Sequence, residues 1–298
     1  QLSGGGTLEL KAAMMGVKDL KITDGSTLLV NVADALPDLT ASSLEIENGS
    51  IVVDQENFGG GDGHDRTLSM KKGDLELKEK LPNNIKTVEI HNGDLKVTGS
   101  GGFEGACSVD LGAQGRLVLE ENSGLSRLVT DDGSKIDTNG KTLSVKSLTP
   151  SDTLNAEVTG NLNLEMADTK KATLKKDVNG KVEVVAPDNG TVTLEAEGDV
   201  KAVAFTTAEV AHTATSVTLK LAANKKIKET LDFAKANAFN LKLLGGNEID
   251  KLSFESTLNV DSGGALPSKN TINFLAPAAD ATLKVTNTGS LSIVDGTK

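Results

Sequence analysis

The sequence predicts an all-β chain that folds as a β-solenoid, a parallel β-helix of about 12 coils. Three observations support this prediction: a phrase of alternating apolar and polar residues recurs, its glycines return every 20–25 residues, and the apolar side chains are nearly all aliphatic. Among 298 residues there are seven Phe, no Trp and no Tyr. A compact enzyme or sandwich normally fills its core with large rings, so this composition favours a narrow interior in which successive layers are alike.

The recurring phrase consists of two short alternating runs on either side of a glycine. Clear copies begin at Leu20 (LKITDGSTLLV), Leu44 (LEIENGSIVV), Val88 (VEIHNGDLKV) and Leu174 (LKKDVNGKVEVV). Alternation places the apolar side chains of each run on one face of an extended chain. Each copy therefore predicts two short strands, each with one buried face.

The glycines of these phrases define the repeat length. They are Gly25, Gly49, Gly73, Gly93, Gly115, Gly140, Gly160, Gly180 and Gly198, with successive gaps of 18 to 25 residues. Asn224, Gly245 and Gly264 are the corners expected between Gly198 and Gly289. A period of this length along the whole chain is typical of a repeat architecture in which each unit is one coil.

The same phrase also fits a second architecture. Asn-Gly and Asp-Gly between alternating runs favour type I′ turns, and antiparallel hairpin repeats of this kind would form β-sandwich domains. In a solenoid the glycine instead marks a corner, and the strands pair in parallel with the coils above and below. The period and the aliphatic core favour the solenoid, while the Asn-Gly turns favour the hairpin.

One segment departs from the phrase. Ile227 and Leu231 lie at helical spacing in a stretch rich in Lys, Glu and Ala, and Asn224 is a suitable N-cap. This pattern predicts one short helix near residues 225–238 that covers or interrupts the stack. We expect residues 1–298 to form a single repetitive β domain, with a subdivision near residues 222–240 as the alternative.

Charge and motif content narrow the classes of function. The net charge of −11 argues against nucleic acid, which needs a basic stripe, and against anionic membrane surfaces. No apolar run is long enough to span a membrane, so we expect no membrane insertion. Cys107, the only cysteine, lies in an apolar run and is expected to be a buried small hydrophobe rather than a nucleophile. No nucleophile elbow, phosphate loop or dinucleotide fingerprint is present, which favours a non-enzymatic protein.

A calcium site is the one candidate for bound metal. Residues 60–65 (GGDGHD) match the beginning of the nonapeptide whose turns hold Ca²⁺ in parallel β-rolls, with Asp62 and Asp65 as candidate ligands. The match departs from that pattern in two ways. The large apolar residue comes one position late, at Leu68, and the motif occurs once, whereas each ion in a β-roll lies between adjacent copies.

Several coil phrases resemble those of a group of bacterial exoproteins. The phrases GDLELKE, GDLKVTG, GNLNLEM and GSLSIVDG resemble the coil repeats of filamentous-hemagglutinin-like adhesins, autotransporter passengers and repetitive parts of surface-layer proteins. The resemblance covers most of the chain in composition, period and turn chemistry. It implies an extracellular bacterial protein at the cell surface, and apart from the calcium motif it assigns no functional residues.

The leading functional hypothesis is a self-assembling protomer of a surface layer or an extracellular filament. The strand-like runs TLELKAA and GSLSIVDGTK show no evident cap, which favours end-to-end self-association. The alternative is an adhesin passenger, for which cell-surface polysaccharide is a candidate partner. A polysaccharide-acting β-helix enzyme is the third hypothesis, although it needs a basic residue in a groove and commonly aromatic platforms, which the sequence does not show.

Overall fold

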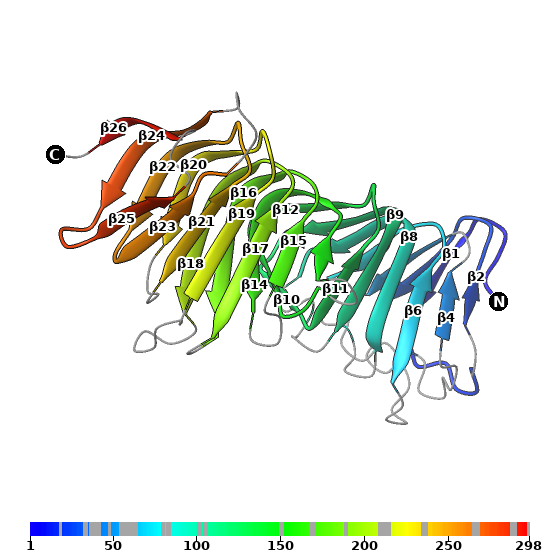
Figure 1. The fold of residues 1–298 in the computed structure, drawn as a ribbon. Coiled ribbons are helices and arrows are strands. Elements are labelled where there is room, and N and C mark those ends of the chain that lie inside the picture. The colour runs from blue at the N-terminus through cyan, green and yellow to red at the C-terminus, as the bar shows by residue number, and fades with distance from the viewer. Residues whose placement is uncertain are drawn as a thin grey trace. The chain divides into compact units, whose positions relative to one another are not determined.

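The computed structural model describes most of the chain. It describes residues 1–17, 20–31, 35, 43–46, 49–53, 65–78, 81, 85–99, 103, 107–148, 152–166, 171–187, 190–207, 216–233, 238–263, 269–286 and 291–296. The chain divides into two compact units, Gln1–Val145 and Lys146–Lys298. Each unit is a stack of short strands (Figure 1).

In the described part of the first unit there are twelve strands. They are β1 (Thr7–Leu10), β2 (Lys21–Ile22), β3 (Ser26–Val30), β4 (Ser43–Ile46), β5 (Gly49–Val53), β6 (Arg66–Met70), β7 (Leu75–Leu77), β8 (Ile85–Val97), β9 (Ser108–Leu119), β10 (Ser123–Leu125), β11 (Arg127–Thr130) and β12 (Lys135–Val145). One ladder runs β1-β3-β5-β7-β8-β9-β12 and a second runs β2-β4-β6-β8-β9-β11. The long strands β8 and β9 belong to both ladders because each turns a corner between them. Strands β10 and β12 form a further parallel pair.

The described residues of the second unit form fourteen strands in two ladders. They are β13 (Thr153–Leu154), β14 (Glu157–Glu165), β15 (Lys171–Leu174), β16 (Val178–Ala186), β17 (Thr191–Ala196), β18 (Val200–Thr207), β19 (Ser216–Leu221), β20 (Lys226–Phe233), β21 (Phe239–Leu243), β22 (Glu248–Phe254), β23 (Thr257–Asp261), β24 (Asn270–Pro277), β25 (Thr282–Thr286) and β26 (Leu291–Gly296). The even-numbered strands pair in order from β14 to β26. The odd-numbered strands form a separate seven-stranded sheet from β13 to β25.

These ladders identify the protein as a β-solenoid. Every pairing between the named strands is parallel, and each strand pairs with the equivalent strand one coil away. The sequence separation between paired residues varies from coil to coil: Thr7 pairs with Thr27, whereas Val203 pairs with Leu231. The hairpin-sandwich alternative is wrong, because hairpins would pair adjacent strands in antiparallel fashion. The structure has about 10 turns, slightly fewer than the predicted 12. The subdivision near residues 222–240 stays a prediction.

Glycines form stacks at the corners, where the backbones of successive coils approach closely. A Cβ on Gly93 would lie 1.9 Å from the carbonyl oxygen of Gly73, and a Cβ on Gly180 would lie 1.9 Å from that of Gly160. Gly93 also has a positive φ of 134°, a conformation that L side chains rarely adopt. These glycines therefore mark corners within the coils rather than hairpin turns.

Asp and Asn side chains connect the corners of successive coils. The Oδ1 atom of Asp177 accepts a hydrogen bond of 2.8 Å from the backbone N–H of Asp199, whose own Oδ1 accepts one of 3.0 Å from the N–H of Lys226. In the same way, the backbone N–H of Lys181 donates a hydrogen bond of 3.2 Å to the Oδ1 atom of Asn161. At a corner the backbone N–H groups leave the ladders and lose their ladder partners. The Asp and Asn side-chain oxygens accept hydrogen bonds from them instead.

The interior of each coil is filled mainly by Leu, Val and Ile, but the second unit also contains a stack of aromatic rings. Phe205 and Phe233 lie with ring centroids 5.2 Å apart and 7° between their planes, and Phe239 lies 5.2 Å from Phe233 at 40°. Phe254 is in register with Phe233 on the next coil. All four are at most 2% exposed. The largely aliphatic core that the composition favoured is therefore interrupted by rings in these coils.

The helix predicted near residues 225–238 is wrong. Lys226–Phe233 form β20, and β21 begins at Phe239. Ile227 and Leu231 are both buried because the chain turns a corner between them, as the register shift before Thr230 shows. Two strand segments joined by a short corner place inward side chains four residues apart, which imitates helical spacing. Asn224 has a φ of 59° and occupies a corner rather than a cap.

Candidate functional site

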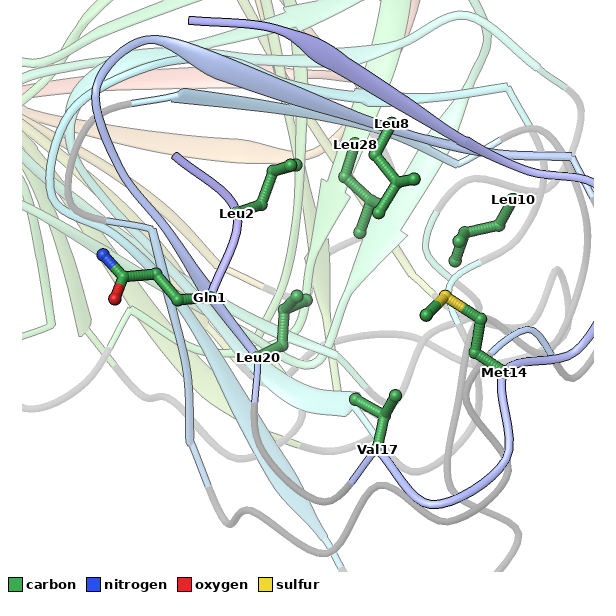
Figure 2. A pocket seen from close by; sticks show the side chains of 8 residues that line it. All are labelled: Gln1, Leu2, Leu8, Leu10, Met14, Val17, Leu20 and Leu28. Atoms are coloured by element: carbon green, nitrogen blue, oxygen red, sulfur yellow. The ribbon is translucent and has the colours of Figure 1, made fainter. Parts of the chain in front are cut away.

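The first coil carries an apolar hollow on the surface of the first unit. Figure 2 shows that Leu2, Leu8 and Leu20 point toward it, and Met14 lies on its border. Leu8 is 37% exposed, although its register partner Leu28 on the next coil is only 1% exposed. The hollow therefore exposes the side chains that a preceding coil would cover.

The last described coil exposes the corresponding surface of the second unit. Ile293 on β26 is 39% exposed, whereas its register partner Ile272 is fully buried. Val294 is 68% exposed. Among the described residues, β26 pairs only with β24 and β25 only with β23, so each of these strands has one edge whose backbone groups meet no neighbouring strand.

The seven-stranded sheet of the second unit presents a polar outer surface, which we call the lysine face. Strand alternation directs rows of side chains outward, parallel register aligns them from coil to coil, and two of these rows carry the charged residues. The first row is Lys171, Thr193, Thr218, Asn240, Asn259 and Lys284. The second row is Glu195, Lys220, Lys242 and Asp261.

One carboxylate on the lysine face joins three coils. Glu195 on β17 forms ion pairs of 3.0 Å with Lys171 on β15 and with Lys220 on β19, and its side chain is only 18% exposed. Burial by itself would raise the pKa of Glu195, but the hydrogen bonds from Lys220 and Lys171 outweigh it and lower that pKa below the ordinary value. The bridge therefore stabilises the stack only while the carboxylate is ionised.

We expect the contribution of Glu195 to stability to disappear in acid. A carboxyl group whose pKa is lowered by folding stabilises the native state above its unfolded pKa of about 4.3, and this contribution is lost as the pH falls through the folded value. At pH 7, Glu195→Gln should lower the free energy of unfolding by about 1 kcal/mol. Urea unfolding at pH 7 and at pH 3 should show the variant and the natural chain converging at the lower pH. The exposed residue Glu157 supplies a control, since Glu157→Gln should change the free energy of unfolding little at either pH. If the stability deficit of Glu195→Gln persisted at pH 3, the ion-pair bridge would be contradicted.

The predicted calcium ligands fall at the border of the described structure. Asp62 lies outside the described residues, and Asp65 is exposed just before β6. In the described part of the chain, no three His, Cys, Asp or Glu residues are grouped so that they could hold a metal ion. Calcium binding at Asp62 and Asp65 stays a prediction.

Cys107 is buried, as predicted. Cys107 is 6% exposed. Burial raises the pKa of its thiol to about 12, so very little of the nucleophilic thiolate form exists at neutral pH. Within the described ranges, no helix is long and apolar enough to cross a membrane.

The lysine face and the aromatic stack were not predicted from the sequence. The signal for the face was present, since TVT at Thr191, SVT at Ser216 and TLN at Thr257 are alternating runs with polar outer positions. Only the register shows that these positions form continuous rows. In comparisons with known proteins, no family model, no curated protein and no solved structure matches the chain.

Proposed function

We propose that this chain is a non-enzymatic structural protein of a bacterial cell surface, which assembles head to tail into a surface layer or an extracellular filament. The observation that supports assembly is the exposed apolar side chains on the first and the last described coil, Leu8 on one and Ile293 on the other. The bacterial and extracellular location rests on the resemblance of the coil phrases to those of surface exoproteins.

Head-to-tail contact would continue the pairing already present inside each unit. Among the described residues β1 pairs with β3 alone, and its other edge would meet the free edge of β26 of another copy in a parallel ladder of the kind seen within each unit. Exposed strand edges are natural sites for such pairing. Because two different surfaces meet, every pair of copies keeps one unused surface of each kind, so growth continues into filaments or closed rings and does not stop at dimers.

Sedimentation velocity of the 298-residue chain tests the proposal. We expect the mean mass to rise continuously with protein concentration, and electron microscopy to show filaments or sheets. Ile293→Lys places an ammonium group on the apolar end and should keep the chain monomeric. Val185→Lys is the matched control, because Val185 is a half-buried residue on β16, away from both ends.

A mixing experiment tests the direction of assembly. Leu8→Lys blocks the first coil and Ile293→Lys blocks the last, so each variant alone should be monomeric. Their mixture should form dimers and nothing larger, through the one intact end of each. Dimers of Leu8→Lys alone would indicate tail-to-tail contact, and a natural chain that stays monomeric at every concentration would overturn the proposal.

A further inference from the structure

The lysine face differs in charge from the rest of the molecule. Its two rows contain four lysines, Lys171, Lys220, Lys242 and Lys284, and two acids, Glu195 and Asp261, which leaves a net charge of +2. The whole chain has a net charge of −11. Lys242 and Lys284 are exposed, and they lie beyond the coils that Glu195 joins. A positive strip on an acidic protein selects a negatively charged partner.

Between the lysines, the face offers regularly spaced groups that form hydrogen bonds. Thr193, Thr218, Asn240 and Asn259 follow one another on four successive coils, at about 4.8 Å per coil. These hydroxyl and amide groups can both donate and accept hydrogen bonds, as the hydroxyl groups of a sugar do.

Hydrogen bonds within the lysine face hold the amide groups in place. The Nδ2 atom of Asn240 donates to the Ser216 Oγ atom at 2.9 Å, and the Nδ2 atom of Asn259 donates to the Asn240 Oδ1 atom at 3.2 Å. The strands beneath are rigid ladder strands with buried inner side chains, such as Leu219 and Leu241. A surface that is already ordered loses little conformational entropy when it binds.

We propose that the lysine face binds a linear acidic polysaccharide, whose carboxylates meet the lysines and whose hydroxyl groups meet the Thr and Asn row. A polymer is the matching partner because the face repeats the same groups from coil to coil, so several sugar units can bind at once. This inference goes beyond head-to-tail assembly and does not depend on it, since none of its residues lies on β1 or β26.

Binding of sodium alginate, a polymer of uronic acids, tests the inference. Calorimetric titration would use the Leu8→Lys chain, so that assembly does not contribute heat, with EDTA present to exclude bridging by divalent cations. We expect saturable binding that weakens as salt increases, and no binding of neutral dextran. The double variant Lys242→Gln/Lys284→Gln should bind about tenfold more weakly.

A matched variant separates the face from the general charge of the protein. Lys251→Gln/Lys269→Gln removes the same charge from exposed positions outside the seven-stranded sheet and should leave alginate affinity unchanged. Equal loss in both double variants, or an absence of alginate binding, would overturn the inference. Equally tight binding of a single-stranded oligonucleotide or of anionic vesicles, lost in the same Lys242→Gln/Lys284→Gln variant, would also overturn it, because the partner would then be any polyanion. Because filament growth is measured without alginate, failure here leaves the assembly proposal intact.

Discussion

Replacing Phe233 with alanine is expected to lower the free energy of unfolding of the second unit by about 3–5 kcal/mol. The ring is fully buried and lies between Phe205 on the preceding coil and Phe254 on the following one. It also contacts Phe239 on the adjacent sheet. Alanine would remove the ring from three neighbours that sit on rigid ladder strands and cannot close the cavity. Urea unfolding followed by far-ultraviolet circular dichroism measures this loss.

Phe274→Ala is the control for this prediction. Phe274 lies on β24 and is only partly buried, with Lys251 as its register partner. Its replacement should cost clearly less than that of Phe233, because a half-exposed ring buries less apolar surface. Phe233→Leu should recover much of the stability, since leucine refills most of the volume. Equal losses for Phe233→Ala and Phe274→Ala would show that the stack has no special role in the core.

Replacing Gly180 with alanine is expected to destabilise the second unit by about 1–3 kcal/mol, although only one methyl group is added. The new Cβ would lie 1.9 Å from the carbonyl oxygen of Gly160 and 2.2 Å from its carbonyl carbon. These are backbone atoms, so neither can move aside as the end of a side chain could. The coils at this corner must separate, which strains the ladder between β14 and β16.

Gly124→Ala provides the comparison, because a Cβ at Gly124 meets no atom within 4 Å. This variant should unfold at nearly the same urea concentration as the natural chain. Hydrogen exchange would locate the effect of Gly180→Ala, with the amides of β14 and β16 losing protection first. Unchanged stability of Gly180→Ala would contradict close stacking of the glycine corners.

The solenoid could be predicted because its determinants are local and repeated. Two alternating runs around a glycine, as at Leu174–Ala186, specify a corner and two strands in every coil. The predicted corners at Asn224 and Gly245 are also confirmed, since both have positive φ and the Asn224 N–H donates to the Gly245 carbonyl at 2.8 Å. A repeated local pattern reports the fold reliably because each coil presents the same pattern to its neighbours.

The helix prediction failed because the corner of a solenoid coil can produce helical spacing of apolar residues. In β20 the inward positions Ile227, Leu231 and Phe233 combine the spacing of a strand with one step across a corner. That step yields the same spacing as a helical turn, and periodicity alone does not distinguish the two. The parallel partners of β20 on both sides resolve the ambiguity, because β18 and β22 impose an extended backbone.

The sequence by itself determined the length of the coil, the positions of its corners and the inward or outward direction of most side chains. Only the tertiary structure decided which side chains meet across coils, and so produced the Phe205–Phe233 stack, the Glu195 bridge and the rows of the lysine face. The physical reason is that parallel ladders join residues about 20 or more positions apart. Alternation determines which face of a strand is buried, but it does not state which residues of two neighbouring coils pair, since the number of residues per coil varies.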